Sequence, residues 1–230
     1  MIGIIGAMGV EIQSLVQMLE NRETVTLSGI EYAKGTIHNR EVVLAVCGIG
    51  KVFAAVCAQT MILKFAPDVI INTGVAGTLT ESLTIGDIAV SENVAQHDMD
   101  TTALGDPAGF LSGINIIKIP ADGKTRQLLV DCIKQLGVNY RTGTICSGDQ
   151  FLASQEVKDR IVKNFGAIAG EMEGGAIGQV CFINNVKFCV LRAISDRADG
   201  SGAENYFEFL EQAAQTAVNV IDRFIKMSGE

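Results

Sequence analysis

Apolar and polar residues follow one another along the chain in two patterns, one typical of strands and the other of helices. Short apolar runs predict strands at residues 2–8, 31–37, 41–47, 69–72, 87–96, 114–119, 140–146, 167–170 and 188–194. Elsewhere apolar residues recur every three or four positions, which predicts helices at residues 10–19, 52–65, 124–136, 155–165 and 173–183, and a last one that ends near residue 227. Strands therefore alternate with helices, which indicates an α/β fold.

Turn and cap residues support the same order of elements. His38-Asn39-Arg40 contains the Asn that is typical of a tight hairpin turn, Pro67 follows the end of a helix, and Ser154 can cap the next one. The alternation predicts a three-layer α/β/α arrangement around a mixed, largely parallel sheet that is buried on both faces. Because no repeat, low-complexity segment or linker interrupts it, we expect a single domain over residues 1–230.

Charge and hydropathy narrow the class of partner. The chain is 48% hydrophobic and 19% charged, with a formal net charge of −8. Binding to nucleic acid or to an anionic membrane requires clustered Lys and Arg, so a small molecule is the expected partner. No apolar run approaches the roughly twenty residues of a membrane span, and the N-terminus lacks the basic region and cleavage site of a signal peptide. We therefore expect a cytoplasmic protein.

Residue types that bind metals are present but poorly spaced for it. His97-Asp98-Met99-Asp100 offers three such side chains, but no second His is nearby, which favours a structural role. The sequence predicts neither a metal nor an organic cofactor. Six cysteines lie singly in apolar stretches without a C-x-x-C pair, and we interpret them as buried reduced thiols: Cys47, Cys57, Cys132, Cys146, Cys181 and Cys189.

Small and acidic residues gather at predicted strand ends, where open α/β sheets bind their ligands. The glycines among them match no nucleotide motif. Gly3-x-x-Gly6-x-x-Gly9 lacks the first glycine pair of the dinucleotide fingerprint, and Gly48-Ile49-Gly50-Lys51 lacks the leading Gly and the final Ser or Thr of a P-loop. The four clusters are Gly6 to Glu11, Gly74 to Gly77, Glu171 to Glu173, and Ser195-Asp196.

Two of these clusters place charges beside apolar strands. If the chain turns into a helix at Glu173, only one of Glu171 and Glu173 needs to reach a ligand, and the other decorates the helix start. An unpaired acid among apolar neighbours is costly, which favours a functional role. Arg192 and Asp196 form either a salt bridge that closes the sheet or part of a site, and the sequence leaves both interpretations open.

Seven motifs in a fixed order together resemble the nucleoside phosphorylase and nucleosidase superfamily, and within it the 5'-methylthioadenosine/S-adenosylhomocysteine nucleosidases. The resemblance covers essentially the whole chain and implies a nucleoside phosphorylase-like domain and a homodimer. The motifs are Gly3-Ile4-Ile5-Gly6-Ala7-Met8 with Glu11, Gly48-Ile49-Gly50-Lys51-Val52, Pro67-Asp68-Val69-Ile70-Ile71-Asn72-Thr73-Gly74, His97-Asp98-Met99-Asp100, Ser147-Gly148-Asp149, Glu171-Met172-Glu173 and Arg192-Ala193-Ile194-Ser195-Asp196.

The resemblance implies hydrolysis of the N-glycosidic bond of 5'-methylthioadenosine, S-adenosylhomocysteine and 5'-deoxyadenosine, with release of adenine, in methionine salvage and the recycling of S-adenosylmethionine by-products. It gives three acids a catalytic role. Asp196 donates a proton toward N7 of adenine and must be protonated near pH 7, Glu11 is the base that activates water, and Glu173 binds the ribose hydroxyls and stabilises positive charge on the sugar.

The resemblance also implies which residues bind the substrate. Phe151 stacks on adenine, main-chain groups at Leu152 read the edge of the base, and Met172 packs beneath the ribose. Val75, Gly77, Arg192 and Ser195 line the site, while Met8, Ile49 and Tyr206 or Phe207 form an apolar channel for the 5'-thio substituent.

Departures from the family pattern bear on substrate preference. The family often has Ser at the position of Val75, Phe at Leu104, and aromatic residues in the segment Asp106-Pro107-Ala108-Gly109, which belongs to the part that reaches a neighbouring subunit's site. Glu173 is followed by Gly174-Gly175 instead of the more usual Ala-Thr, which predicts a looser helix start.

Three functional alternatives follow. Related phosphorylases carry an Arg where this chain has Asn72, so water is the expected nucleophile in place of phosphate. The same chemistry also serves aminodeoxyfutalosine nucleosidases of menaquinone synthesis. A non-catalytic module that binds adenine nucleosides is a further alternative, because a fold alone does not establish activity.

Overall fold

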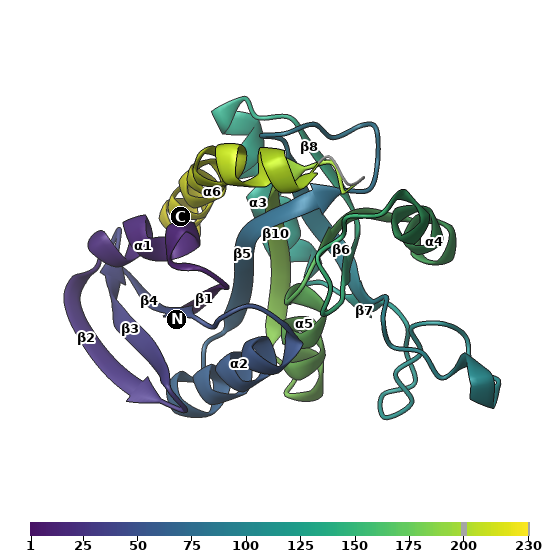
Figure 1. Cartoon of the computed structure of the whole chain (residues 1–230). Coiled ribbons are helices and arrows are strands. Elements are labelled where there is room, and N and C mark those ends of the chain that lie inside the picture. The colour runs from purple at the N-terminus through teal and green to yellow at the C-terminus, as the bar shows by residue number, and fades with distance from the viewer. Residues whose placement is uncertain (199–201, 230) are drawn as a thin grey trace.

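The computed structural model describes residues 1–198 and 202–229, without the side chains of residues 202–208. Its helices and strands follow one another in the predicted alternation (Figure 1). The elements are β1 (Ile2–Gly6), α1 (Gly9–Gln17), β2 (Glu20–Leu27), β3 (Ile30–Ile37), β4 (Arg40–Val46), α2 (Lys51–Phe65), β5 (Val69–Thr78), β6 (Ile88–Gln96), a 3-10 turn (Thr102–Leu104), β7 (Ile119–Pro120), α3 (Gly123–Leu136), β8 (Tyr140–Ser147), α4 (Gln155–Phe165), β9 (Ala167–Glu171), α5 (Gly174–Ile183), β10 (Lys187–Asp196) and α6 (Gly202–Met227).

The strands form one mixed sheet in which part of the path closes on itself. The order is β10-β6-β8-β9-β5-β1-β4-β3-β2, and β10 also pairs with β5. Strands β5, β9, β8, β6 and β10 therefore make a closed ring, while β1, β4, β3 and β2 extend from it as an open sheet. The pairings of β1 with β4 and β5, of β10 with β5, and of β8 with β6 and β9 are parallel.

Helices cover both faces of the sheet. Helices α1 and α3 pack against α6, which lies on β5 and β10, whereas α2 and α5 pack together on the opposite side (Figure 1). Strands β1 and β9 are buried over their whole length, as expected for strands covered on two sides. The three-layer α/β/α architecture with a mixed sheet is thus confirmed.

The hairpin predicted at residues 38–40 is also confirmed. Both His38 and Asn39 have positive φ angles, 50° and 59°, which match the two central positions of the tight turn between β3 and β4. Ser154 does stand at the N-cap position of α4, but its side chain makes no capping hydrogen bond, so the predicted capping role is wrong.

Two strand predictions differ from the structure. Strand β2 was not predicted because its sequence is mostly polar, and in the structure it is an exposed edge strand that pairs only with β3 among the described strands. The strand predicted at residues 114–119 is wrong. Asn115 adopts a left-handed conformation with φ of 54°, which interrupts an extended run, so only Ile119 and Pro120 pair with β6.

Candidate active site

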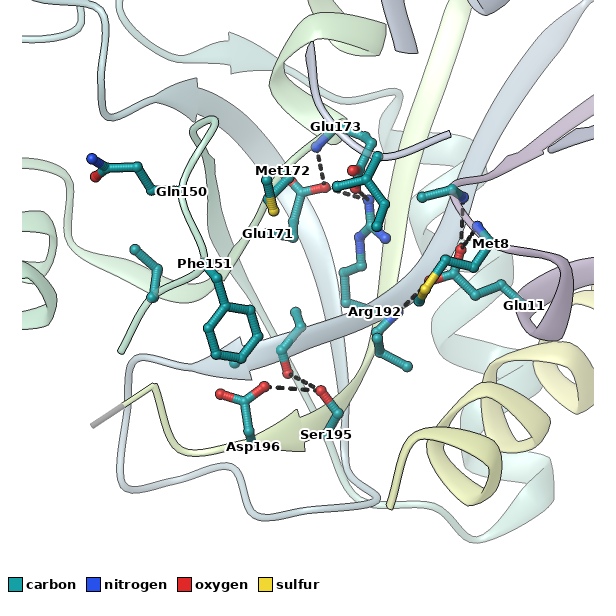
Figure 2. A pocket seen from close by; sticks show the side chains of 17 residues that line it. Met8, Glu11, Gln150, Phe151, Glu171, Met172, Glu173, Arg192, Ser195 and Asp196 are labelled. Atoms are coloured by element: carbon teal, nitrogen blue, oxygen red, sulfur yellow. Dashed lines mark hydrogen bonds and ion pairs between the residues drawn. The ribbon is translucent and has the colours of Figure 1, made fainter. Parts of the chain in front are cut away.

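A cavity of about 350 Å³ opens where β1, β5, β9 and β10 end, within the size range of small-molecule sites (Figure 2). All the predicted site residues with described side chains line it. The lining residues are Ala7, Met8, Glu11, Ile49, Val75, Ala76, Gly77, Gln150, Phe151, Leu152, Gly170, Glu171, Met172, Glu173, Arg192, Ser195 and Asp196.

Two predicted site residues have no described side chains, and five residues that line the cavity were not predicted. Tyr206 and Phe207 belong to α6, but their side chains are outside the described residues, so their role stays a prediction. Sequence reasoning singled out Glu171 without assigning it to the site. Ala7, Ala76, Gln150 and Gly170 line the cavity without carrying a chemical signal that could have marked them.

Glu11 is held at the beginning of α1. It occupies the third helical position, and its Oε2 accepts hydrogen bonds from the amides of Ala7 at 2.6 Å and Met8 at 2.9 Å. Its Oε1 accepts from the amide of Val75 at 3.2 Å. The carboxyl is almost fully buried, so these amides, together with the helix N-terminus, orient it toward the cavity.

Glu173 ends the extended segment after β9 and forms the N-cap of α5. Its Oε1 accepts a hydrogen bond from the amide of Gly50 at 2.9 Å, and its Oε2 lies 3.4 Å from Nη2 of Arg192. The chain does turn into a helix at Glu173, as anticipated, and Glu171 and Glu173 accept from different backbone amides.

Arg192 pairs with these acids and not with Asp196, which corrects the salt bridge considered from the sequence. Its Nη2 donates to Oε2 of Glu171, to Oδ1 of Asn72 and, at a longer distance, to Oε2 of Glu173. Arg192 is 1% exposed, so its charge has to be compensated inside the protein. Since β10 runs parallel to β5 in register Arg192 to Gly74, the guanidinium crosses above β5 and reaches both acids.

Asp196 lies at the opposite side of the cavity from Glu11, beneath the ring of Phe151 (Figure 2). Its Oδ1 accepts from the amide of Ala198 at 2.8 Å, and its Oδ2 accepts from the hydroxyl of Ser195 at 3.0 Å. The two donors lie at the end of β10 and just beyond it, and they fix the orientation of the carboxyl group of Asp196, which is 3% exposed.

Two glycines of β5 let these side chains approach the strand. A Cβ at Gly74 would collide with Nη1 of Arg192 and lie 2.5 Å from Oε1 of Glu11, and one at Gly77 would lie 2.7 Å from Oδ1 of Asp196. The cluster Gly74 to Gly77, which we placed after the predicted strand at residues 69–72, is therefore part of β5 itself. Gly74 and Gly77 are three residues apart, which sets the two acids about 10 Å apart along the strand.

Burial changes the acid–base behaviour of two of the acids. Burial raises the pKa of Glu11 above its ordinary value, although Arg192 and the three amides oppose this shift. Burial also raises the pKa of Glu173 to about 7; Arg192 acts against the shift, and the negative charges of Glu171 and Glu11 add to it. Such perturbed carboxyl groups in a cavity are typical of functional sites.

Apolar side chains line the same cavity and lie next to the acids. Phe151 is 48% exposed and its ring lies over Asp196, while Met172 lies beside Glu171 and Met8 beside Glu11 (Figure 2). Leu152 also lines the cavity. An exposed aromatic ring over a buried carboxyl group is suited to a planar polar heterocycle.

The candidate metal motif at residues 97–100 makes structural contacts through Asp98. Oδ1 of Asp98 pairs with Nζ of Lys51 at 2.7 Å, and its Oδ2 accepts from the amide of Asp149 at 2.9 Å. These contacts join the beginning of α2 to the loops after β6 and β8. Among the described residues, no group of three or more His, Cys, Asp or Glu side chains is arranged to hold a metal ion.

Comparison with known proteins assigns the family. The family model of the phosphorylase superfamily matches residues 1–226 of the chain. The chain belongs to the phosphorylase superfamily. Within this superfamily, the chain is 41% identical over 227 residues to the 5'-methylthioadenosine/S-adenosylhomocysteine nucleosidase of Staphylococcus saprophyticus, an alignment that covers 98% of this chain and 99% of the relative.

Solved structures of the superfamily have the same fold. The Neisseria meningitidis 5'-methylthioadenosine/S-adenosylhomocysteine nucleosidase in complex with methylthio-immucillin-A is 35% identical, with a TM-score of 0.95 and 98% of each chain covered. A futalosine hydrolase mutant of Helicobacter pylori is also 35% identical, with a TM-score of 0.94 and 98% of each chain covered. In the part of the chain that the structure describes, no helix is long and apolar enough to cross a membrane.

Proposed function

We propose that the protein is an N-glycosyl hydrolase that cleaves 5'-methylthioadenosine and S-adenosylhomocysteine, and also 5'-deoxyadenosine, to adenine and the corresponding ribose derivative. The observation that carries this proposal is the meeting of Glu11, Glu173 and Asp196, from three distant stretches of the chain, at one cavity with an exposed aromatic ring. Relatives named for this activity align over nearly the whole chain.

The reaction needs one acid and one base on opposite sides of the bond. Water attacks C1' of the ribose while the bond from C1' to N9 breaks, Asp196 gives its proton to N7 so that adenine leaves neutral, and Glu11 takes the proton of the water. The positions of Asp196 beneath Phe151 and of Glu11 across the cavity fit this division (Figure 2). A raised pKa makes Glu11 a stronger base once it is ionised.

The charge of the site suits the developing sugar cation. Among the described lining residues, four are acids, Glu11, Glu171, Glu173 and Asp196, whereas Arg192 is the one base. A buried excess of negative charge stabilises a ribosyl group with oxocarbenium character more strongly than it stabilises the neutral substrate. Glu173, beside Met172, is the acid we assign to the ribose hydroxyls.

Water is the proposed nucleophile because Asn72 stands where related phosphorylases carry an Arg, and its side chain is uncharged and already hydrogen-bonded. Its amide donates to the carbonyl of Ile5 at 3.0 Å, and its Oδ1 accepts from Arg192. Arg192 is positively charged, but Glu171 and Glu173 compensate its charge. It therefore offers a phosphate group no uncompensated positive charge.

The test is the release of adenine from 5'-methylthioadenosine by the purified protein, followed by chromatography with and without phosphate. We expect adenine and methylthioribose at a rate that phosphate does not change. Asp196→Asn should lower kcat by about 10²–10⁴-fold with the fold intact by circular dichroism, because the general acid is lost. Accumulation of a ribose 1-phosphate derivative would instead indicate a phosphorylase, and binding without turnover would indicate the non-catalytic module.

The futalosine hydrolase relative makes aminodeoxyfutalosine the second candidate substrate. Val75, which lines the cavity where the family often has Ser, and the segment at residues 106–109 are the departures that bear on this choice. Comparing kcat/KM for 5'-methylthioadenosine, S-adenosylhomocysteine and aminodeoxyfutalosine decides it, and we expect the first two to be preferred.

We also propose that the enzyme is a cytoplasmic homodimer. Each of the six cysteines is a buried free thiol, as in proteins of reducing compartments. Helix α2 exposes Val52 and Leu63, 74% and 76% exposed, beside Phe53, and it packs against α5, which exposes Ile183. An apolar surface of this kind on a helix pair is typical of a subunit interface, and a second copy of the chain is the partner we assign to it.

A further inference from the structure

Glu171 accepts four hydrogen bonds, more than Glu11 or Glu173, although the proposed reaction assigns it no proton transfer and no contact with the substrate. Its Oε1 accepts from the hydroxyl of Ser147, and its Oε2 accepts from the amides of Glu173 at 3.0 Å and Gly174 at 2.7 Å and from Nη2 of Arg192. Four donors converge on one carboxyl group, which is the environment of a carboxylate anion.

Ser147 fixes this carboxylate from behind. The serine is fully buried at the end of β8, accepts a hydrogen bond from the amide of Gly175 at 2.6 Å and donates its own proton to Glu171. The hydroxyl cannot reverse its direction without losing one of the two bonds. Ser147 and the first amides of α5 therefore hold Glu171 in one position.

Arg192 is shared unequally between the two acids of the segment. Nη2 of Arg192 lies 3.4 Å from Oε2 of Glu173 and is closer to Oε2 of Glu171. Glu173 receives a single hydrogen bond from the backbone, that of Gly50. The main positive charge near Glu173 is thus directed at its neighbour.

We propose, as a step that rests on the proposed function, that Glu171 is a positioning residue: its carboxylate, held by Ser147 and by the start of α5, engages the guanidinium of Arg192 and thereby leaves Glu173 available to the ribose. Without this competitor Arg192 would pair fully with Glu173 and withdraw it from the substrate. Glu171 acts through Arg192 and needs no contact with the reacting atoms.

The charged and titratable groups around Glu173 determine in which direction its pKa moves when Glu171 is replaced. They are Arg192 from β10, Glu171 from β9, Glu11 from α1 and the thiol of Cys47 after β4, besides the amide of Gly50. When Glu171 is made neutral, Arg192 keeps its charge and Glu173 becomes its nearest carboxylate. The pKa of Glu173 should then fall from its value of about 7 by roughly one unit or more.

The experiment uses Glu171→Gln, which keeps the shape of the side chain and one acceptor oxygen for the amides of α5 but removes the charge. The carboxyl carbon of Glu173 is followed by NMR in protein labelled with 13C at the glutamate carboxyl groups, and its signal is assigned by its loss in Glu173→Gln. We expect its titration midpoint to move to lower pH in Glu171→Gln. The pH profile of kcat/KM for 5'-methylthioadenosine should show a limb displaced in the same direction.

Two controls separate positioning from simple support of the fold. Ser147→Ala removes one donor and leaves the charge of Glu171, so the midpoint of Glu173 should change much less than in Glu171→Gln. Glu171→Asp keeps the charge one methylene further from Arg192 and should give a smaller shift of the same sign; it replaces Glu171→Gln if that variant does not fold.

An unchanged midpoint of Glu173 in the folded variant would overturn the proposal, even if activity were lost, because loss of activity alone fits a purely structural role. The NMR titration requires no turnover. A protein that shows the shift but releases no adenine would therefore refute the proposed function and leave the positioning role intact.

Discussion

Glu11 and Glu173 lie where water is largely excluded, so the stability of the protein depends on pH through them. A carboxyl group with a raised pKa binds its proton more tightly in the folded than in the unfolded chain. For Glu173 the two values are 4.5 for an exposed glutamate and about 7 in the fold. The resulting stability is fully present below pH 4.5 and is lost as the pH rises through about 7.

We therefore predict that the ligand-free protein loses stability between about pH 5 and pH 8. The contribution of Glu173 is on the order of 3 kcal/mol, and that of Glu11 has the same sign. Glu173→Gln should flatten the dependence, because the amide does not titrate. Differential scanning calorimetry over this range measures it, and a melting temperature of the wild type that rises with pH would contradict the assignment.

A second prediction at the level of single residues concerns Gly74. Because a Cβ at this position would collide with Arg192 and Glu11, Gly74→Ala should displace both and lower kcat/KM by at least roughly tenfold. Gly113→Ala is the matched control, since nothing lies within 4 Å of its Cβ position, and it should leave the rate unchanged. Steady-state kinetics with 5'-methylthioadenosine compares the two.

That these acids line one cavity was more predictable than which groups they hydrogen-bond with. Glu11, Glu173 and Asp196 could be selected from the sequence because each follows an apolar strand and belongs to a motif. The pairing of Arg192 with Glu171 could not be predicted from the sequence. Arg192 and Asp196 lie on the same strand, and only the register of β10 on β5 shows which acid the guanidinium reaches.

At the level of elements, the start of α5 is closely packed against its neighbours. Gly174 and Gly175 were expected to loosen the helix, yet in the structure they bring its first turn against Val190 and Ser147. A Cβ at Gly175 would lie 2.9 Å from Oγ of Ser147 and 3.0 Å from Cγ of Gln96. The two glycines therefore serve close approach more than flexibility.

Gly175→Ala should accordingly destabilise the protein by about 1 kcal/mol or more, although alanine favours helices, because overpacking outweighs the gain in helix propensity. Gly123→Ala, at the first position of α3, is the control: its nearest neighbour is Nη2 of Arg126 at 3.9 Å, so we expect stabilisation of up to about 1 kcal/mol. Urea denaturation measures both, and equal effects would refute the packing argument.

Hydrophobic periodicity predicted the helices and the buried strands well and failed in two segments, β2 and residues 114–119. Strand β2 is a mostly polar edge strand, and only its last four residues, Thr24 to Leu27, alternate between polar and apolar, which is the shortest run that predicts a strand. Residues 114–119 do carry an apolar pattern, but the segment lies in the part that projects from the body of the molecule (Figure 1), where a left-handed Asn115 breaks it.

For the whole molecule, the proposed dimer gives a prediction of its own. The apolar surface of α2 and α5 should cause the protein to elute at about twice its mass of 24.4 kDa, and Val52→Glu combined with Leu63→Glu should give monomers, because charge at a buried interface is costly. Light scattering after size-exclusion chromatography measures the mass. Leu136→Glu, a partly exposed apolar position on α3, should remain dimeric; a monomeric wild type would exclude the dimer.

The closed ring of β5, β9, β8, β6 and β10 has a kinetic consequence. Contacts of the site join residues that are 64, 120 and 123 positions apart: Glu11 with Val75, Asn72 with Arg192, and Gly50 with Glu173. Such distant pairings form slowly, since the chain must lose the entropy of long loops before they form. During refolding, helical signal should return early, and the ability to process nucleosides should return only with the slowest phase.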